Sequence, residues 1–236
     1  MSEWIKIDDL KVEVRRSSRR KHVDLSVDRG GEVVVSVPDK LETEEIEKAV
    51  RSKLVWIYST LGRKRETQSR EPLKEFVSGE GFYYLGRKYR LQMCPPANAA
   101  TKEEPFVFSQ NRFYLHESAL NCAQSHFIKW YTKEASKWIE VRVDTLKARV
   151  NAKPTGVGIC DLGFRWASCT RSGKLNFHWR TILLPAERLD YLVLHELVHL
   201  HEHNHSPAFY ERLERACPNH KRHEAWFRLH GDKYSL

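Results

Sequence analysis

The sequence predicts an α+β fold in which a β-rich N-terminal region precedes a domain built from helices and a small sheet. Apolar and polar residues alternate over much of residues 1–40, which is the period of a half-buried strand. Segments with helical spacing of apolar residues follow, over about residues 119–150 and again after Pro185. We expect residues 1–116 to form the first region and residues 117–236 the second, packed together as one compact unit.

The first region is expected to contain several strands and one helix. An apolar stripe predicts the helix over residues 43–61, with Thr43 as its cap. A hairpin turn is expected at residues 28–31, a polar connector at 62–75 and a loop at 94–105. No internal repeat is visible. The predicted strands cover residues 12–14, 23–27, 33–37, 82–93 and 106–116.

The second region begins with the long predicted helix at residues 119–150. A later helix begins at Pro185, and another is expected to be capped by Ser206, with Pro207 in its first turn. Gly231 is expected to end the last helix. The apolar face expected for the long helix consists of Leu120, Phe127, Trp130, Ala135, Trp138 and Val141. Strands are predicted at residues 157–160, 164–169 and 174–179.

Composition and charge restrict the class of protein. No apolar run approaches the roughly 20 residues that a membrane helix needs, and the first residues lack the plan of a secretion signal, so we expect a cytoplasmic protein without a membrane partner. The 5 cysteines form no CxxC pair, which favours reduced thiols over a disulfide framework. The net charge of +9 would suit a nucleic acid or nucleotide partner at the basic surface. No known nucleic-acid motif accompanies the charge, and an ordinary solvated surface is the simpler interpretation.

A histidine-rich segment at residues 194–209 carries the clearest chemical signal. His195 and His199 enclose Glu196 in an HExxH pattern. Residues four apart on a helix lie on one face, so both imidazoles can reach a single ion. Zinc accepts such nitrogen ligands, and a catalytic zinc usually has three protein ligands and a water molecule. Glu196 would then take a proton from that water, so we expect one zinc ion and a catalytic carboxylate.

The third metal ligand is less strongly specified by the pattern. We prefer His205, because a chain reversal near Asn204 would return its imidazole to the ion. The spacing is similar to the metzincin HExxHxxGxxH, except that Glu202 occupies the glycine position. Gluzincins use a glutamate from a later helix instead. The alternatives are therefore Glu211, Glu214, His201 and His203.

Longer segments resemble a known family. The stretch from "FRWASC" through "LHELVHLHEHNHSPAF" to "HKRHEAW", with "VRRSSRRKHVDLSVDRGGEVVVSVP" and "GFYYLGRKYRL", resembles the YgjP-like metallopeptidase domain, a relative of the SprT-like and WLM zinc proteases. The resemblance implies a zincin-like helix and sheet domain, with HExxH on the active-site helix and His205 as the third zinc ligand. The family commonly has Arg-Trp-Gly-Ser-Cys where this chain has Ala167. If that glycine admits a substrate backbone or a positive φ, Ala167 changes access or preference.

These observations predict a zinc-dependent hydrolase, most simply a peptidase that acts on a peptide or protein. Residues 164–179 are expected to supply an edge strand that holds an extended peptide by main-chain hydrogen bonds. Cys169 is a minor candidate for an inhibitory thiolate. Candidate contacts to the substrate or to the transition-state oxyanion are Arg165, Trp166, Tyr210, His220, Arg222 and, as an alternative to His220, His223.

Two other functions are compatible with the sequence. A metal-dependent nucleoside triphosphate pyrophosphatase or phosphohydrolase would suit the basic runs, although such enzymes prefer oxygen-rich magnesium sites to three histidines. A non-catalytic, zinc-stabilised module associated with nucleic acid would not need Glu196 beside a ligand. It would also close the site with a fourth protein ligand.

Overall fold

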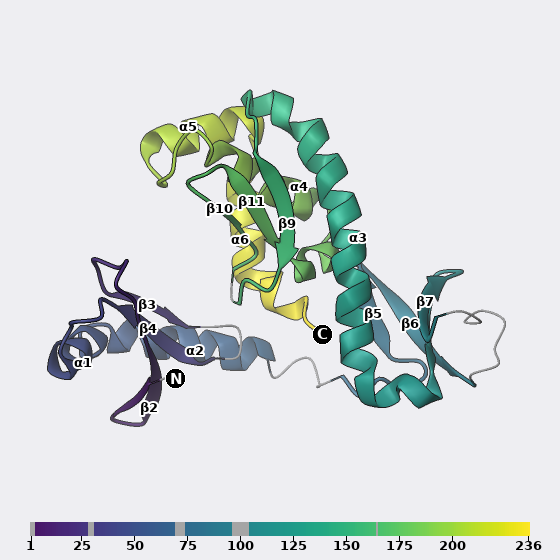
Figure 1. Ribbon diagram of the computed structural model, residues 1–236, viewed down its shortest axis with the longest axis horizontal. Helices are drawn as coiled ribbons and strands as arrows, with labels where there is room; N and C mark the ends of the chain where they lie inside the picture. Colours follow the sequence, from purple (N-terminus) through teal and green to yellow (C-terminus); the bar gives the residue numbers. More distant parts are fainter. Residues whose placement is uncertain (1–2, 28–30, 69–73, 96–103, 164) are drawn as a thin grey trace. The chain divides into compact units, whose positions relative to one another are not determined.

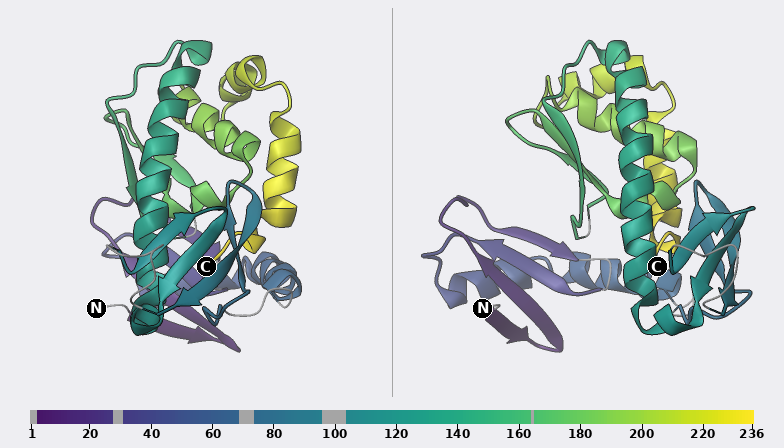
Figure 2. Two further views of the ribbon diagram at one scale, coloured as in Figure 1. Left: turned by 90° about the vertical axis from the view of Figure 1, so that its right-hand side faces the viewer. Right: turned by 45° about the vertical axis from the view of Figure 1, so that its right-hand side comes forward.

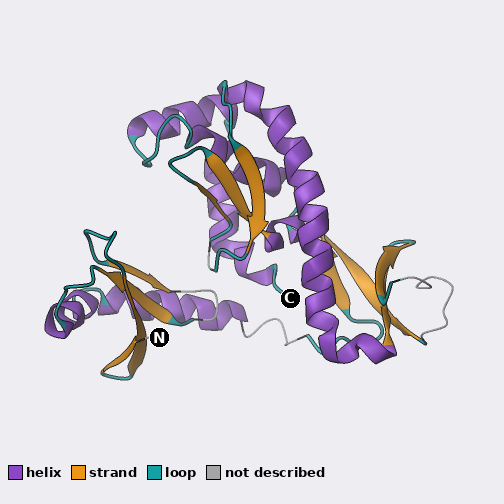
Figure 3. Cartoon of the chain, viewed as in Figure 1, coloured by secondary structure: helices purple, strands orange, loops and turns teal. Residues whose placement is uncertain are grey.

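The structure is a computed structural model that describes residues 3–27, 31–68, 74–95, 104–163 and 165–236. It is a mixed α+β fold of helices and three sheets, as the sequence predicts (Figure 3). Contacts divide the chain into an N-terminal unit, Met1–Pro72, and a C-terminal unit, Leu73–Leu236. Among the described residues, no helix combines the length and the apolar character that a bilayer crossing requires.

The N-terminal unit is a four-stranded sheet packed against two helices. Its described elements are β1 (Glu3–Ile7), β2 (Leu10–Arg16), β3 (Asp24–Val27), β4 (Val33–Val37), α1 (Thr43–Arg51) and α2 (Leu54–Gln68). The strand order is β1-β2-β4-β3, in which β2 and β4 run parallel and the other pairs antiparallel. Valines at alternate positions bury one side of the sheet, and Ile46, Val50 and Ile57 of the helices close this core. The strands predicted from the valine pattern are confirmed.

The helix predicted over residues 43–61 is divided into α1 and α2. Ser52 ends α1, because its hydroxyl donates to the carbonyl oxygen of Ala49 at 2.7 Å and competes with the helical pattern. The cap is Glu42 and not Thr43, and the backbone N–H of Glu42 donates to the Glu45 carboxylate at 3.4 Å. The α2 helix extends into the expected connector. Residues 28–30 of the predicted turn and 69–73 of the connector lie outside the described residues.

The C-terminal unit begins with a sheet of the same topology as the first. Its strands are β5 (Gly81–Tyr84), β6 (Arg87–Cys94), β7 (Phe106–Ser109) and β8 (Arg112–His116). The order β5-β6-β8-β7, with β6 and β8 parallel and the other pairs antiparallel, repeats the arrangement of β1 to β4. The strands predicted at residues 82–93 and 106–116 are confirmed, each as a pair around a turn. Of the predicted loop, residues 96–103 lie outside the described residues.

A long helix, α3 (Ala123–Leu146), joins this sheet to the rest of the unit. It is flanked by the 3-10 turns η2 (Glu117–Cys122) and η3 (Lys147–Val150). Figures 1 and 2 show the β5–β8 sheet beside one end of α3 and a second sheet beside the other. Phe127 of α3 packs on Phe82 and Phe106 with ring centroids 4.3 and 4.4 Å apart. Because these strands share their core with α3, the contacts divide the chain after Pro72, and not after residue 116 as expected.

The buried face of α3 differs in part from the expected one. Phe127 and Ala135 are buried as predicted, but Leu120 and Val141 are 45% and 63% exposed. The predicted set combined positions from two faces, whereas the observed face follows steps of three or four residues along one side. It consists of Ala123, Phe127, Tyr131, Ala135, Ile139, Val143 and Leu146.

The second sheet and three helices complete the C-terminal unit. Their bounds are β9 (Gly156–Cys160), β10 (Ala167–Cys169), β11 (Lys174–His178), η4 (Trp179–Leu183), α4 (Ala186–Val198), α5 (Pro207–Ala216), α6 (His220–His230) and η5 (Gly231–Lys233). The order β10-β11-β9 places β10 at an edge, antiparallel to β11 and in contact with α4. The Arg142 guanidinium of α3 donates to both carboxylate oxygens of Asp190 in α4, at 2.6 and 2.7 Å. Residue 164 of the predicted strand lies outside the described residues.

Candidate metal centre

Three histidines converge where α4 ends and α5 begins. His195 lies in the last turn of α4 and His199 is its C-cap residue. The chain then reverses, and Ser206 starts α5 by accepting a hydrogen bond from the backbone N–H of Phe209 at 3.3 Å. This reversal returns His205 to the end of α4. One possible ligand nitrogen from each of His195, His199 and His205, here called the triad, lies within 4.8 Å of the other two.

Phe209 supports all three imidazoles. Its ring is fully buried and its centroid lies 4.9 Å from that of His195, 4.5 Å from His199 and 4.7 Å from His205. Phe209 ends the block His-Ser-x-x-Phe, residues 205–209, within the stretch "LHELVHLHEHNHSPAF" that carries the family resemblance. Its contacts explain that block physically, since the helix that Ser206 caps carries the platform on which the three rings pack.

The hydrogen bonds of the triad indicate how it presents its nitrogens. Nδ1 of His199 lies 2.9 Å from the carbonyl oxygen of Glu202, so Nδ1–H donates and Nε2 keeps its lone pair. The Nε2 atoms of His195 and His205 face each other at 3.0 Å. A single proton at most can lie between them, whereas a cation would satisfy both lone pairs. The donor set therefore fits a metal ion.

Burial keeps two members of the triad, His195 and His199, in the neutral form that metals bind. Burial first, and then the neighbouring charges of His199 and His205, lower the pKa of His195 to about 3. Burial also lowers the pKa of His199. Because a proton competes with a metal for the same lone pair, imidazoles that stay neutral in mild acid are prepared for a cation.

Glu196 follows His195 on α4 and has a buried carboxyl group. It is only 5% exposed, and burial raises its pKa to about 8, against an opposing effect of the positive charge of Arg165. Cys169 of β10 is close enough for the charge of Glu196 to act on it. Burial first and this charge second raise the pKa of the Cys169 thiol, which disfavours the thiolate required of an inhibitory ligand.

The structure places the other predicted contact residues at different distances from the triad. The ring of Tyr210 lies 6.2 Å from that of His205, and His220 lies 6.1 Å behind Tyr210. Trp166 packs against Phe227 of α6 at 5.7 Å. Among the described residues, no hydrogen bond, ion pair or ring contact joins the exposed Arg222 side chain to the triad.

The alternative third ligands do not belong to the triad. Nε2 of His201 lies 2.9 Å from the carbonyl oxygen of Val150 in η3. Glu211 forms an ion pair with Arg215 one turn further along α5. Neither Glu214 nor His203 belongs to the cluster of potential ligands found among the described residues.

Sequence reasoning missed Tyr191, which lies four residues before His195 on α4. The two rings pack edge to face at 5.9 Å. On its other side Tyr191 stacks on His223 at 5.0 Å, and Nδ1 of His223 lies 2.8 Å from an Nη1 of Arg188. The helical spacing from His195 was the available signal, since residues four apart share a face. His223 is thus held in this stack.

Ala167 occupies an ordinary strand position. It pairs with Phe177 in the β10–β11 ladder, and its φ is not positive. A left-handed backbone is therefore not the reason for a glycine at this position. The remaining expectation, that the methyl group alters access to the backbone of β10, stays a prediction.

Comparison with known proteins agrees with a metallopeptidase. The family model described as "YgjP-like, metallopeptidase domain" matches residues 21–230. No curated protein matches the chain. Among solved structures, the chain is similar to the crystal structure of the metallopeptidase zymogen of Pyrococcus abyssi abylysin, with 24% sequence identity and a TM-score of 0.35. That match covers 37% of this chain and 89% of the other.

Proposed function

The chain belongs to the YgjP-like metallopeptidase domain family, and from this premise we propose that it is a zinc peptidase whose catalytic centre is the triad. Metallopeptidases use a metal ion and act on peptides or proteins. The observation that carries the proposal is the cluster of three imidazole nitrogens within 4.8 Å, together with the buried carboxyl group of Glu196, the residue that follows His195. Three neutral nitrogen donors favour zinc over magnesium or calcium, which prefer oxygen ligands.

His195, His199 and His205 would hold one zinc ion in a zincin-like domain, with HExxH on α4 as its active-site helix. When bound, zinc would polarise the scissile carbonyl group and lower the pKa of a water molecule. The bond from His199 Nδ1 to Glu202 fixes one ligand, and the Phe209 platform limits the movement of all three rings.

Glu196 would move the proton in peptide hydrolysis. Its carboxylate accepts a proton as the water oxygen adds to the carbonyl carbon, and it donates that proton to the amide nitrogen as the C–N bond breaks. A pKa near 8 in the metal-free chain indicates a stronger base than an exposed glutamate. The positive charge of Arg165, and later of the metal, stabilises the ionised form that must accept the proton.

The edge strand β10 would hold the substrate. An extended peptide can add to a free strand edge through main-chain hydrogen bonds, and β10 is the edge strand in contact with α4. Arg165 and Trp166 directly precede β10 and would line the same side. Tyr210 is 39% exposed beside His205, which makes its hydroxyl the better placed candidate for steadying the oxyanion.

No observation favours the other two functions. The potential ligands of the triad are all nitrogen atoms, unlike the oxygen-rich sites of phosphate-directed enzymes. A closed structural zinc site would require a fourth protein ligand, and the cluster contains three residues among those described.

Two substitutions test the proposal. Glu196→Gln should retain one zinc per chain and lose casein and peptide hydrolysis by about 10²–10⁴-fold, because proton transfer is lost. His205→Ala should lose most of its zinc, measured by atomic emission after dialysis. His203→Ala is the matched control, since it removes an exposed histidine outside the triad and should retain both properties. Full hydrolysis by Glu196→Gln would contradict the proposal.

A further inference from the structure

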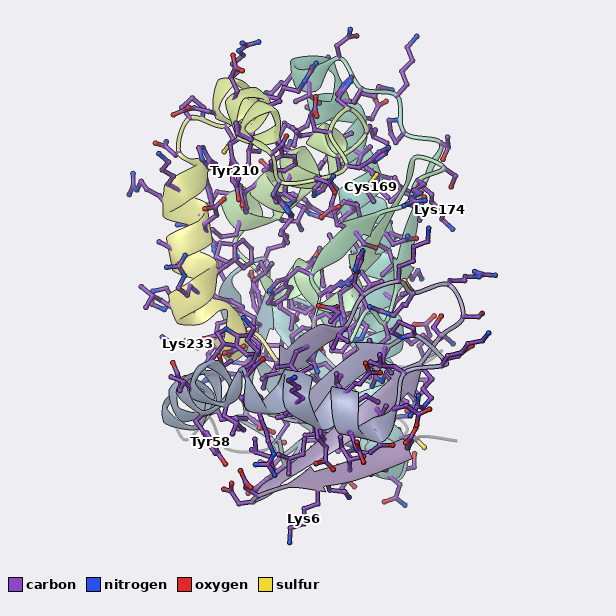
Figure 4. All side chains as sticks on the ribbon, turned by 90° about the vertical axis from the view of Figure 1, so that its left-hand side faces the viewer. Lys6, Tyr58, Cys169, Lys174, Tyr210 and Lys233 are labelled. Atoms are coloured by element: carbon purple, nitrogen blue, oxygen red, sulfur yellow. The ribbon has the colours of Figure 1, made fainter. Side chains whose placement is uncertain are left out.

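A pocket of about 550 Å³ lies between α5 and α6. We call it the α5–α6 pocket. Figure 4 shows Tyr210, one of its walls, where these two helices approach each other. Its polar and aromatic lining consists of Tyr210, Glu211, Glu214, His220, Lys221 and Glu224.

Two contacts connect this pocket to the triad. The Tyr210 ring lies 6.2 Å from that of His205. At the other wall, Glu224 accepts a hydrogen bond from the Tyr191 hydroxyl at 3.5 Å, and the Tyr191 ring lies 5.9 Å from that of His195. A substrate chain bound at the triad would therefore have a side chain within reach of the pocket.

The charge of the pocket is opposite to that of the chain. Three carboxyl groups and one ammonium line it, in a protein whose net charge is +9. Glu211 forms an ion pair with Arg215 of its own helix. Among the described residues, Glu214 and Glu224 form no ion pair, so their charges remain available to a ligand.

His220 provides an independent sign that the pocket takes a ligand. Its side chain lines the pocket although only 2% of the residue is exposed. Its Nδ1 is buried and has no hydrogen-bond partner among the described residues. Buried polar atoms are nearly always paired, so an unpaired one at a pocket wall indicates a missing polar partner. Tyr210 adds an aromatic face, which attracts cations.

We propose that the α5–α6 pocket binds a lysine or arginine side chain of the peptide substrate, within two residues of the scissile bond. A lysine ammonium has three donors and no acceptor, and an arginine guanidinium has five. The pocket offers them the carboxylates of Glu214 and Glu224 and the face of Tyr210. The inference rests on the proposed peptidase function and specifies its substrate class as basic peptides.

Cleavage of a peptide library by the zinc-loaded full chain tests this preference. Mass spectrometry should show lysine or arginine enriched at one fixed position near the cut. Glu214→Gln and Glu224→Gln should each lower kcat/KM about 10-fold for a peptide with lysine at that position, which corresponds to about 1.4 kcal/mol, and leave its glutamine counterpart unchanged. Glu117→Gln, an exposed glutamate outside the pocket, should change neither. Cleavage without a basic preference would overturn the inference and leave the peptidase function intact.

A binding measurement separates this failure from failure of the peptidase function. Zinc-loaded Glu196→Gln is titrated with a capped pentapeptide, Ala-Ala-Lys-Ala-Ala, and with its glutamine analogue, by NMR. Tighter binding of the lysine peptide, lost when Glu214→Gln is added, supports the pocket even if the wild type cleaves nothing. Equal binding of the two peptides overturns the pocket.

Discussion

Two sheets with the same strand order, β1–β4 and β5–β8, belong to two different hydrophobic cores. Each is followed in sequence by a helix that packs on it, α1 in the first case and α3 in the second. The first sheet, with α1 and α2, closes a core of its own. The second shares its core with α3 and through it with α4, which carries two of the three histidines. The same topology thus serves as an independent unit in one place and as a support for the candidate site in the other.

The turns between the first two strands of each sheet show how this difference arises. In the second sheet, the backbone N–H groups of Leu85 and Gly86 donate to the carbonyl oxygens of Ile182 and Leu183, at 2.8 and 3.0 Å, just before α4. In the first sheet the corresponding residues are Asp8 and Asp9, and Asp8 pairs with Arg51 at the end of α1. One turn therefore anchors the start of the candidate active-site helix, while the other holds its own unit together.

The largest effect is expected from truncating the core of the second sheet. Phe127→Ala removes a ring that packs on Phe82 and Phe106, and should lower the free energy of unfolding by about 3–5 kcal/mol. Because this core continues to α4, zinc affinity should fall as well. Ile46→Ala should lower the free energy of unfolding of the N-terminal unit by about 2–5 kcal/mol and leave zinc affinity unchanged. Chemical unfolding and zinc titration of both variants would show whether the two cores are independent.

The turn at Gly86 gives the next largest effect. A Cβ there would lie 2.8 Å from Cα of Pro185, and the φ of +79° disfavours any other residue. Gly86→Ala should destabilise the C-terminal unit by about 2–4 kcal/mol. The control is Gly62→Ala in α2, where a Cβ meets nothing within 4 Å. The higher helix propensity of alanine should raise the free energy of unfolding there by about 0.5–1 kcal/mol. Equal effects of the two substitutions in thermal unfolding would contradict the anchoring role.

A pH effect should distinguish the units in the metal-free protein. The folded pKa of Glu196, about 8, lies above its ordinary value of 4.5, so its contribution to stability is complete below pH 4.5 and is lost as pH rises towards 8. Between pH 6.5 and 8 the loss should be about 2 kcal/mol relative to Glu196→Gln. In the N-terminal unit the hydrogen bond from Arg16 lowers the pKa of Glu3, the opposite direction. A constant difference between wild type and Glu196→Gln over this pH range would show that Glu196 is not buried in its acid form.

The smallest effect is expected from removing the N-terminal unit. Residues 73–236 contain the whole core around α3 and α4 and all three histidines. A chain truncated to these residues should fold and bind zinc within about twofold of the full chain, since parts with separate cores contribute independently. Circular dichroism and a competitive zinc titration would check this. A much weaker affinity would mean that the site depends on the first sheet.

Local patterns determined much of this protein. The alternating valines predicted β2, β3 and β4 of the first sheet, but not β1. The spacing of His195 and His199 placed both on one helix face. Ser206 and Pro207 predicted the start of α5, because capping depends on neighbouring residues alone. A chain reversal expected near Asn204 favoured His205 as the third ligand, and the family resemblance implied the same residue.

Only the tertiary structure decided the rest. The common strand order of the two sheets, the division after Pro72, the edge position of β10 and the platform of Phe209 beneath the triad depend on contacts between residues far apart in sequence. The α5–α6 pocket also depends on tertiary contacts, since two of its lining residues, Tyr210 and Glu224, belong to different helices. A periodic pattern indicates which face of an element is buried, but not what covers it, because many partners of similar hydrophobicity would bury that face equally well.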